Sequence, residues 1–217
     1  MDSITLKELL GLRPSEPAIS QYIDSLVEVA EATASSPDVK SYSDVVYFNF
    51  YPLGISLLFV PMNGYKPKAG LRLDGLQQGD LILDSIDIYN VPKTDETDGG
   101  ESKPLRSEFA FMTFPVSPIT LPITAQLEDS DGKPLVRPPC IDVTSESTGK
   151  DLVQAVGEPD RKGGGAGPLS GSINIWCEWS KDGLMVEFDG AQGKAWDTGK
   201  DAVWKVITLF RPGMKHS

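Results

Sequence analysis

Apolar and polar residues alternate along several short stretches of the chain, and each of these stretches predicts a β-strand. The clearest example is VVYFNFYPLGISLLF (residues 45–59), where two alternating runs are separated by a turn that ends at Gly54. A short turn ending in glycine between two such runs is typical of a β-hairpin. LILDSIDIY (residues 81–89) alternates strictly and predicts a third strand. The first half of the chain therefore predicts a small antiparallel sheet.

The same order of elements returns in the second half. INIWCEWSKDGLMVEF (residues 173–188) is again an aromatic strand, a turn ending in Gly183 and an aliphatic strand that closes on Phe. Residues 203–210 predict the strand that follows. Aligning the two turn glycines also aligns Tyr47 with Trp176. The two halves therefore predict one unit of helix, hairpin, long loop and third strand that is used twice.

A helix is predicted ahead of each hairpin. The first begins at residues 15–17, with a proline in its first turn, and continues to about Ala30 with apolar residues at i, i+3, i+4 and i+7. The second begins at residues 147–151 and ends at Gly157. A shorter helix is predicted at residues 5–10. With the strands above, these elements indicate an α+β protein.

A polar segment separates the two halves. Residues 93–104 (KTDETDGGESKP) contain almost no apolar side chains and predict a flexible acidic loop. We therefore expect two pseudo-repeated lobes, each a helix packed on a small antiparallel sheet, at residues 1–92 and 105–217. The glycine run at 163–167 is interpreted as a flexible connection before the second hairpin.

The second half resembles a known fold. A helix that ends in Gly157-Glu158-Pro159, a glycine-rich loop at 163–165 and then a tryptophan strand followed by Gly-Leu-x-Val-x-Phe are similar to the beta-lactamase-inhibitor-protein-like fold. This unit also occurs in small bacterial outer-membrane assembly lipoproteins and in immunity-type proteins. The resemblance covers residues 150–212 best and 15–92 more loosely, and no lipoprotein cysteine lies near the start. It implies two repeats joined in one curved sheet whose concave face binds another protein.

Alternation along the strands separates two faces of the predicted sheets. One set is apolar and should face the helices: Val46, Phe48, Phe50, Ile175, Cys177 and Trp179. The other face mixes polar and aromatic side chains, and aromatic residues often anchor protein interfaces. Its candidate protein-binding residues are Tyr47, Tyr89, Trp176, Met185, Trp204 and Phe210. An alternative is that a long loop, 61–80 or 115–139, folds over this face as a second core.

The charge of the chain narrows the class of partner. Its 217 residues carry a formal net charge of -11, and such a surface repels the phosphates of nucleic acids. The acidity either maintains solubility or favours a basic protein partner. No basic segment precedes an apolar core at the N-terminus, and no apolar run approaches the roughly 20 residues of a membrane span. The sequence therefore predicts a soluble protein, cytoplasmic or otherwise intracellular, unless a signal segment has been removed.

Signatures of catalytic and metal-binding sites are missing from the sequence. The single histidine, His216, lies next to the end, so neither a Ser-His-Asp triad nor a histidine metal site is expected. Cys140 and Cys177 form no CxxC pair and no disulfide framework. The glycine run lacks the Lys-Ser/Thr of a P-loop, and residues 128–133 begin like a calcium loop that lacks its final glutamate. We expect no cofactor and no metal.

Three functions remain open at this point. The first is a non-enzymatic protein-binding module of inhibitor, immunity or adaptor type that uses the aromatic face. The second is a carrier that holds a small ligand between that face and the long loops. The third is a hydrolase that uses paired carboxylates for acid-base chemistry, for which the candidates are Asp84, Asp87, Glu178 and Glu187.

Overall fold

The chain divides into two compact units, Met1–Val116 and Ser117–Ser217. Both contain antiparallel strands and an α-helix, which confirms the predicted α+β class. The predicted loop at 93–104 and His216 lie outside the residues that the structure describes. The structure is a computed structural model that describes residues 5–33, 36–91, 110–124, 126–128, 133–167, 170–188 and 199–212.

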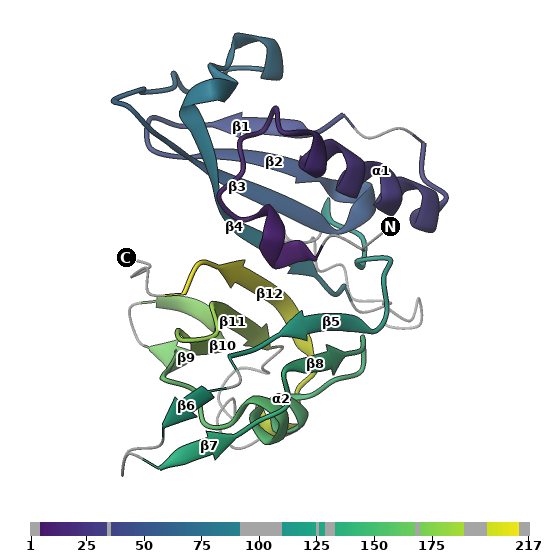
Figure 1. The fold of residues 1–217 in the computed structure, drawn as a ribbon, viewed down its shortest axis with the longest axis vertical. Helices are drawn as coiled ribbons and strands as arrows, with labels where there is room; N and C mark the ends of the chain where they lie inside the picture. The colour runs from purple at the N-terminus through teal and green to yellow at the C-terminus, as the bar shows by residue number, and fades with distance from the viewer. Residues whose placement is uncertain are drawn as a thin grey trace. The chain divides into compact units, whose positions relative to one another are not determined.

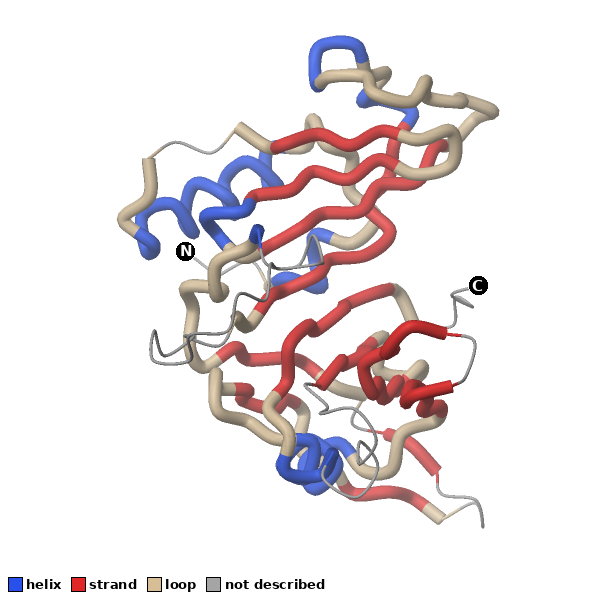
Figure 2. The backbone as a smooth tube through the Cα atoms, turned by 180° about the vertical axis from the view of Figure 1, so that it is seen from behind, coloured by secondary structure: helices blue, strands red, loops and turns tan. Residues whose placement is uncertain are grey.

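The first unit packs a helix on one face of a four-stranded sheet (Figure 1). The helix is α1 (Pro17–Ala30), and the strands are β1 (Asp38–Ser41), β2 (Val46–Phe50), β3 (Ile55–Pro61) and β4 (Leu81–Tyr89). They lie in chain order, each antiparallel to its neighbours, and Figure 2 shows them side by side. Short 3-10 helices complete the unit: η1 (Leu6–Leu9), η2 (Tyr51–Leu53), η3 (Leu73–Gly75) and η4 (Gln78–Asp80).

Helix α1 follows the apolar stripe that predicted it. Pro17 occupies its first turn, where its missing N–H costs nothing, and Glu31 ends it in the left-handed conformation. Ile19, Ile23 and Leu26 are buried. Burial of each such side chain stabilises the folded state by about 1.5–3 kcal/mol. The strand residues expected to face the helix are also buried: Val46, Phe48 and Phe50.

The turn between β2 and β3 requires a glycine. Gly54 has a φ of +60°, and a Cβ there would overlap the backbone of Met112, Thr113 and Phe114. An L-residue at this position would therefore suffer both a left-handed backbone and a steric clash. The turn at Gly54 therefore packs directly against the backbone of the segment from 110 to 116.

Residues 110–116 belong to the first unit. The Phe111 ring stacks on Tyr89, with centroids 3.8 Å apart and planes at 5°, and it lies 4.6 Å from the ring of Tyr51. The N–H groups of Met112 and Phe114 donate to the carbonyls of Tyr51 and Tyr89. The lobe expected to begin at residue 105 therefore begins later, because this aromatic segment pairs with the ends of β2 and β4.

The second unit also combines a helix with four antiparallel strands. The helix is α2 (Gly149–Val156), and the strands are β9 (Arg161–Gly167), β10 (Ser170–Trp179), β11 (Leu184–Phe188) and β12 (Trp204–Phe210). The strand order is β12-β11-β10-β9. Two further antiparallel ribbons and a 3-10 helix accompany them: β5 (Ile119–Pro122) with β8 (Cys140–Val143), β6 (Gln126–Glu128) with β7 (Pro134–Val136), and η6 (Gly199–Asp201).

The glycine run expected to be a flexible connection is instead strand β9, paired with β10. The reason is visible at Gly163, which lies opposite Trp176 in this pair. A Cβ on Gly163 would come within 2.7 Å of Trp176 Cε2, so the indole ring covers the glycine. An aromatic side chain across from a strand glycine compensates for its missing side chain.

Two tryptophans fix the ends of α2. The Trp179 indole N–H donates to the Gly157 carbonyl at 2.8 Å, just after the helix. The Trp204 indole N–H donates to the Thr144 carbonyl at 2.7 Å, ahead of it. Both rings are buried. The residues expected to face this helix are accordingly buried at Ile175 and Trp179, while Cys177 is half-buried.

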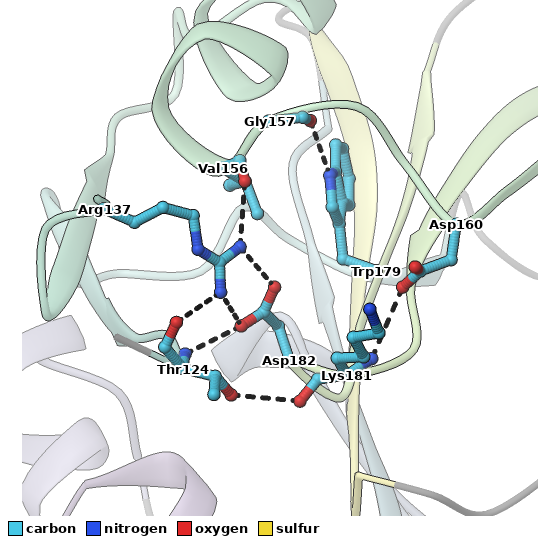
Figure 3. A network of polar contacts seen from close by, with 8 residues as sticks. All are labelled: Thr124, Arg137, Val156, Gly157, Asp160, Trp179, Lys181 and Asp182. Atoms are coloured by element: carbon cyan, nitrogen blue, oxygen red, sulfur yellow. Dashed lines mark hydrogen bonds and ion pairs between the residues drawn. The ribbon is translucent and has the colours of Figure 1, made fainter. Parts of the chain in front are cut away.

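A buried ion pair joins the β7–β8 connection to the β10–β11 turn (Figure 3). Arg137 lies 2.8 Å from Asp182, and the two side chains are 4% and 1% exposed. Arg137 also donates to the carbonyls of Val156 and Thr124, while Asp182 accepts from the Thr124 N–H. This network holds four separate segments of the second unit together.

Candidate functional site

Four polar side chains form a row across the helix-free face of the first unit. The strand register pairs Asp38 with Asn49, Asn49 with Ser56, and Ser56 with Asp87. Because neighbouring strands lie about 4.8 Å apart, the row extends over about 14 Å. Residues directly opposite one another in adjacent strands point to the same face, so these four side chains share one surface.

Aromatic residues border this polar row. Tyr47 lies in the adjacent row, and the Tyr42 ring meets it edge-on at 6.3 Å. On the other side, the stacked rings of Phe111 and Tyr89 stand next to Tyr51. Between these walls is a cavity of about 360 Å³, lined by Lys40, Tyr42, Val45, Tyr47, Asn49, Tyr51, Ser56, Asp87, Tyr89 and Phe111.

The floor of the cavity contains a buried amide with an unused hydrogen-bonding group. Asn49 is only 7% exposed, and its Oδ1 accepts a hydrogen bond of 2.8 Å from the Ser56 hydroxyl. Its Nδ2 has no hydrogen-bond partner within the described ranges. Nδ2 does not belong to the fully buried side-chain atoms without a partner, so it is accessible to solvent from the cavity. A bound acceptor could therefore take the place of water at this group.

The electrostatic environment of the cavity combines one cation with several carboxylates. The Lys40 ammonium lies 5.8 Å from the centroid of the Tyr51 ring, and interaction with the Tyr51 side chain raises the pKa of Lys40. The Tyr51 hydroxyl in turn donates to Asp38 at 3.0 Å. Burial raises the pKa of Tyr47, and the charges of Asp87 and Asp44 raise it further. The aromatic walls therefore stand in a negative field and already contact one ammonium group.

The candidate protein-binding residues belong to both units. Tyr47 and Tyr89 line the cavity of the first unit. In the second unit, Trp176 and Met185 are half-buried on the helix-free side of the sheet. Trp204 and Phe210 are 2% and 1% exposed and form no part of an exposed face.

A β-bulge explains why the position expected for Trp204 is wrong. Glu187 pairs with Val206, and Phe188 pairs with Trp204, so Lys205 is an extra residue in β12. The extra residue reverses the alternation, and Trp204 faces the helix beside Phe188. Phe210 is buried where the Gly183 turn packs closely against its backbone and its N–H donates to the Gly183 carbonyl.

The helix-free face of the second unit is closed by its own side chains. Glu178, which aligns with Asn49, is 4% exposed. Its carboxylate accepts hydrogen bonds from the Ser180 hydroxyl and, at 3.2 Å, from Arg161. The Arg161 guanidinium also lies 5.8 Å from the Trp176 ring, which covers Gly163. These groups satisfy one another, whereas Asn49 Nδ2 of the first unit has no partner among the residues that the structure describes.

Several lining residues were not selected from the sequence: Lys40, Tyr42, Asn49, Ser56, Tyr51 and Phe111. Asn49 and Ser56 carry a usable signal, because each is a polar position inside an otherwise apolar strand pattern. Phe111 carries none, because its return to the first unit depends on tertiary structure. Loop 61–80, which the structure describes throughout, supplies no residue to the lining.

The four carboxylates considered for acid-base chemistry do not converge on this cavity. Asp87 lines it, whereas Asp84 does not, and Glu178 and Glu187 lie in the other unit. Within the described part of the chain, no three His, Cys, Asp or Glu side chains are grouped as metal ligands. Among the same residues, no helix combines the length and apolar character needed to cross a membrane.

Comparisons with models of protein families, with curated proteins and with solved structures found no match for this chain.

Proposed function

We propose that this protein is a non-enzymatic binding module that holds a basic segment of a partner protein on the helix-free face of its first unit. The observation that carries the proposal is the Asn49 amide, which is 7% exposed and keeps an unpartnered Nδ2 in the cavity lining. The lysine or arginine side chains of the partner would contact the tyrosine walls, and a backbone carbonyl of the partner would accept from Asn49.

Charge complementarity supports a basic partner. The chain has a net charge of -11, and Asp38, Asp44 and Asp87 lie in or beside the cavity. Aromatic faces attract cations, with interactions of about 0.5–1 kcal/mol at exposed sites and more when the cation is desolvated. Lys40 already uses Tyr51 in this way. A cationic partner would therefore find both a ring surface and a negative field.

We further propose that the two units are copies of one ancestral unit, as in the beta-lactamase-inhibitor-protein-like fold that the sequence resembles. Gly54 and Gly183 support this, because both have φ near +60° and follow the first strand of a hairpin. The Gly54 carbonyl accepts from the Tyr89 N–H, and the Gly183 carbonyl accepts from the Phe210 N–H. In this proposal the first copy keeps an open binding face, and the second closes the same face with the Glu178 network.

Titration calorimetry with short synthetic peptides tests the binding function. We expect a lysine- and arginine-rich peptide to bind, and a glutamate-rich peptide of the same length not to bind. Added salt should weaken binding, because part of the affinity is electrostatic. Asn49→Leu and Tyr47→Ala should each reduce the affinity about tenfold, which corresponds to about 1.4 kcal/mol.

The variant Lys40→Met tests whether the cavity prefers a positively charged partner. Removing a positive charge from the lining should tighten binding of the basic peptide, up to about fivefold, the range of exposed charge pairs. Lys66→Met makes the same charge change at an exposed residue outside the lining and should have little effect. Weaker binding of the basic peptide to Lys40→Met, or preference for the acidic peptide, would refute the proposal. Equal binding of lysine amide and the peptide would favour a small-ligand carrier instead.

A further inference from the structure

A second cavity, of about 320 Å³, lies beside α2 in the second unit. Its floor includes Ile175, Cys177 and Phe188, which lie on the helix-facing side of their sheet. The cavity of the first unit, in contrast, lies on the helix-free side of its sheet. The helix supplies Val153 to its apolar lining. The full set of described lining residues is Gly149, Lys150, Val153, Gln154, Glu158, Pro159, Lys162, Ile175, Cys177, Phe188 and Lys200.

The cavity lies where the short helix α2 leaves part of its sheet without a helix above it. Helix α2 has 8 residues, whereas α1 has 14. At a rise of 1.5 Å per residue, α2 is about 12 Å long and α1 about 21 Å. The shorter helix covers less of its sheet, so Cys177 stays half-buried while Phe48, its counterpart in the aligned hairpin, is buried. The floor is apolar: Ile175 and Phe188 are buried in it, and Cys177 and Val153 are the half-buried apolar groups that a ligand would contact.

The rim of the cavity is positively charged. Lys150, Lys162 and Lys200 line it, and Glu158 is the one acidic residue among the described lining residues. None of the three lysines has an ion-pair partner in the described part of the chain. Lys162 pairs with Cys177 across β9 and β10, so its side chain stands on the same face as the thiol. In a chain of net charge -11, this is a local excess of positive charge over an apolar floor.

We propose that this cavity binds a small anionic amphiphile, in which a carboxylate, sulfate or phosphate group contacts the lysine rim and an apolar tail fills the floor. The volume suits a short acyl or aromatic group, since the smallest ligand pockets in proteins have volumes of about 300 Å³. Neither the residues nor the charge preference of this site overlaps with the cavity of the first unit. The proposal therefore does not depend on the proposed function.

The Cys177 thiol provides a direct readout of occupancy. Burial raises the pKa of this thiol, so its alkylation by iodoacetamide is followed in mildly alkaline buffer. Cys140 is exposed and would react first, so the experiment uses the full chain carrying Cys140→Ser. Decanoate below its micelle concentration should slow alkylation of Cys177 at least about tenfold when saturating. Decyltrimethylammonium has the same tail with the opposite charge, and it should protect little.

Variants of the rim separate charge recognition from simple burial of the tail. Lys150→Gln and Lys162→Gln should each raise the decanoate Kd about threefold to tenfold, measured by titration calorimetry. Lys181→Gln changes an exposed lysine outside the lining and should leave the Kd unchanged. Val153→Trp, which fills the cavity, should abolish protection while circular dichroism shows an intact fold.

Three results would overturn the proposal. The first is no protection by decanoate in the folded protein, and the second is equal protection by both amphiphiles. The third is a decanoate Kd that is unaffected by both rim substitutions. The Kd values of decanoate, decyl sulfate and decyl phosphate, which share the alkyl tail and differ in the anionic group, then identify the preferred ligand class.

Discussion

The Ser56 hydroxyl donates a hydrogen bond of 2.8 Å to Asn49 Oδ1 across strands β2 and β3. Both side chains are buried on the helix-free face of the first unit. The bond fixes the orientation of the amide, so that Nδ2 is the group left for a ligand. One hydroxyl therefore has two roles: it satisfies a buried acceptor, and it aims the donor that a partner would use.

Replacing Ser56 by alanine should affect both roles. Asn49 Oδ1 loses its donor, and a buried acceptor left unsatisfied costs about 1–3 kcal/mol. We expect the free energy of unfolding in urea to fall by that amount. Ser20→Ala is the matched control, because the Ser20 hydroxyl makes its hydrogen bond on an exposed helix surface. Such surface changes stay within about 0.5 kcal/mol. Equal losses for the two variants would contradict the buried pair.

Alanine at Gly54 or Gly183 should destabilise the protein strongly. Both residues have left-handed backbones, which cost a non-glycine residue about 1–2 kcal/mol. A Cβ would also clash with backbone atoms, of Met112 at Gly54 and of Phe210 at Gly183. Gly64 has a φ of +77° but nothing within 4 Å of its Cβ position. Urea unfolding of Gly64→Ala should therefore show only the backbone cost, and a similar loss for all three variants would refute the clash.

Breaking the Arg137–Asp182 pair should cost about 3–5 kcal/mol, because either single substitution leaves a buried charge without its partner. We expect Arg137→Met and Asp182→Leu to be close to this range in urea unfolding. The double variant should lose less than the sum of the two, and its deviation from additivity measures the coupling. Additive losses would show that the two charges are energetically independent.

Stability at acidic pH should depend on Asp151. Hydrogen bonds from the Thr148 backbone and hydroxyl lower the pKa of this carboxyl below its usual value near 3.8. A group whose pKa is lower in the folded state stabilises the protein above the unfolded-state pKa, and this contribution is lost as the pH falls through the folded-state pKa. Between about pH 6 and pH 2.5, the free energy of unfolding should therefore fall less steeply for Asp151→Asn than for the native chain. Parallel curves would contradict this.

Regular local patterns in the sequence predicted the elements well. The strand at 81–89 was predicted with the bounds of β4. The alternation expected to be strict is interrupted in the structure, because a bulge at Asp84 shifts the phase between Leu83 and Ser85. The helix expected to begin at residues 15–17 and to continue to about Ala30 corresponds to α1, whose start is marked by Pro17. Each signal lies inside the element it predicts, so no tertiary information is needed.

The candidate site was predicted only in part, and its failures share a cause. The bulge at Lys205 changes the face of Trp204, but a bulge is set by pairing with β11, which the sequence of β12 does not show. The glycines of β9 read as a loop because the ring that covers Gly163 comes from Trp176 in another strand. Asn49 and Ser56 had the right pattern, yet their importance depends on the cavity above them.

The stacking of Phe111 on Tyr89 has a consequence for how the first unit can be cut from the chain. A fragment that ends at residue 92 would retain all four strands and α1, but it would lose the ring that stands against Tyr51 and Tyr89. Gly54 would also lose the backbone segment on which its turn packs. A fragment that keeps both the complete cavity and the packing of the Gly54 turn therefore has to extend through Phe114. Its C-terminal boundary is set by an aromatic stack and a turn contact rather than by the end of the last strand.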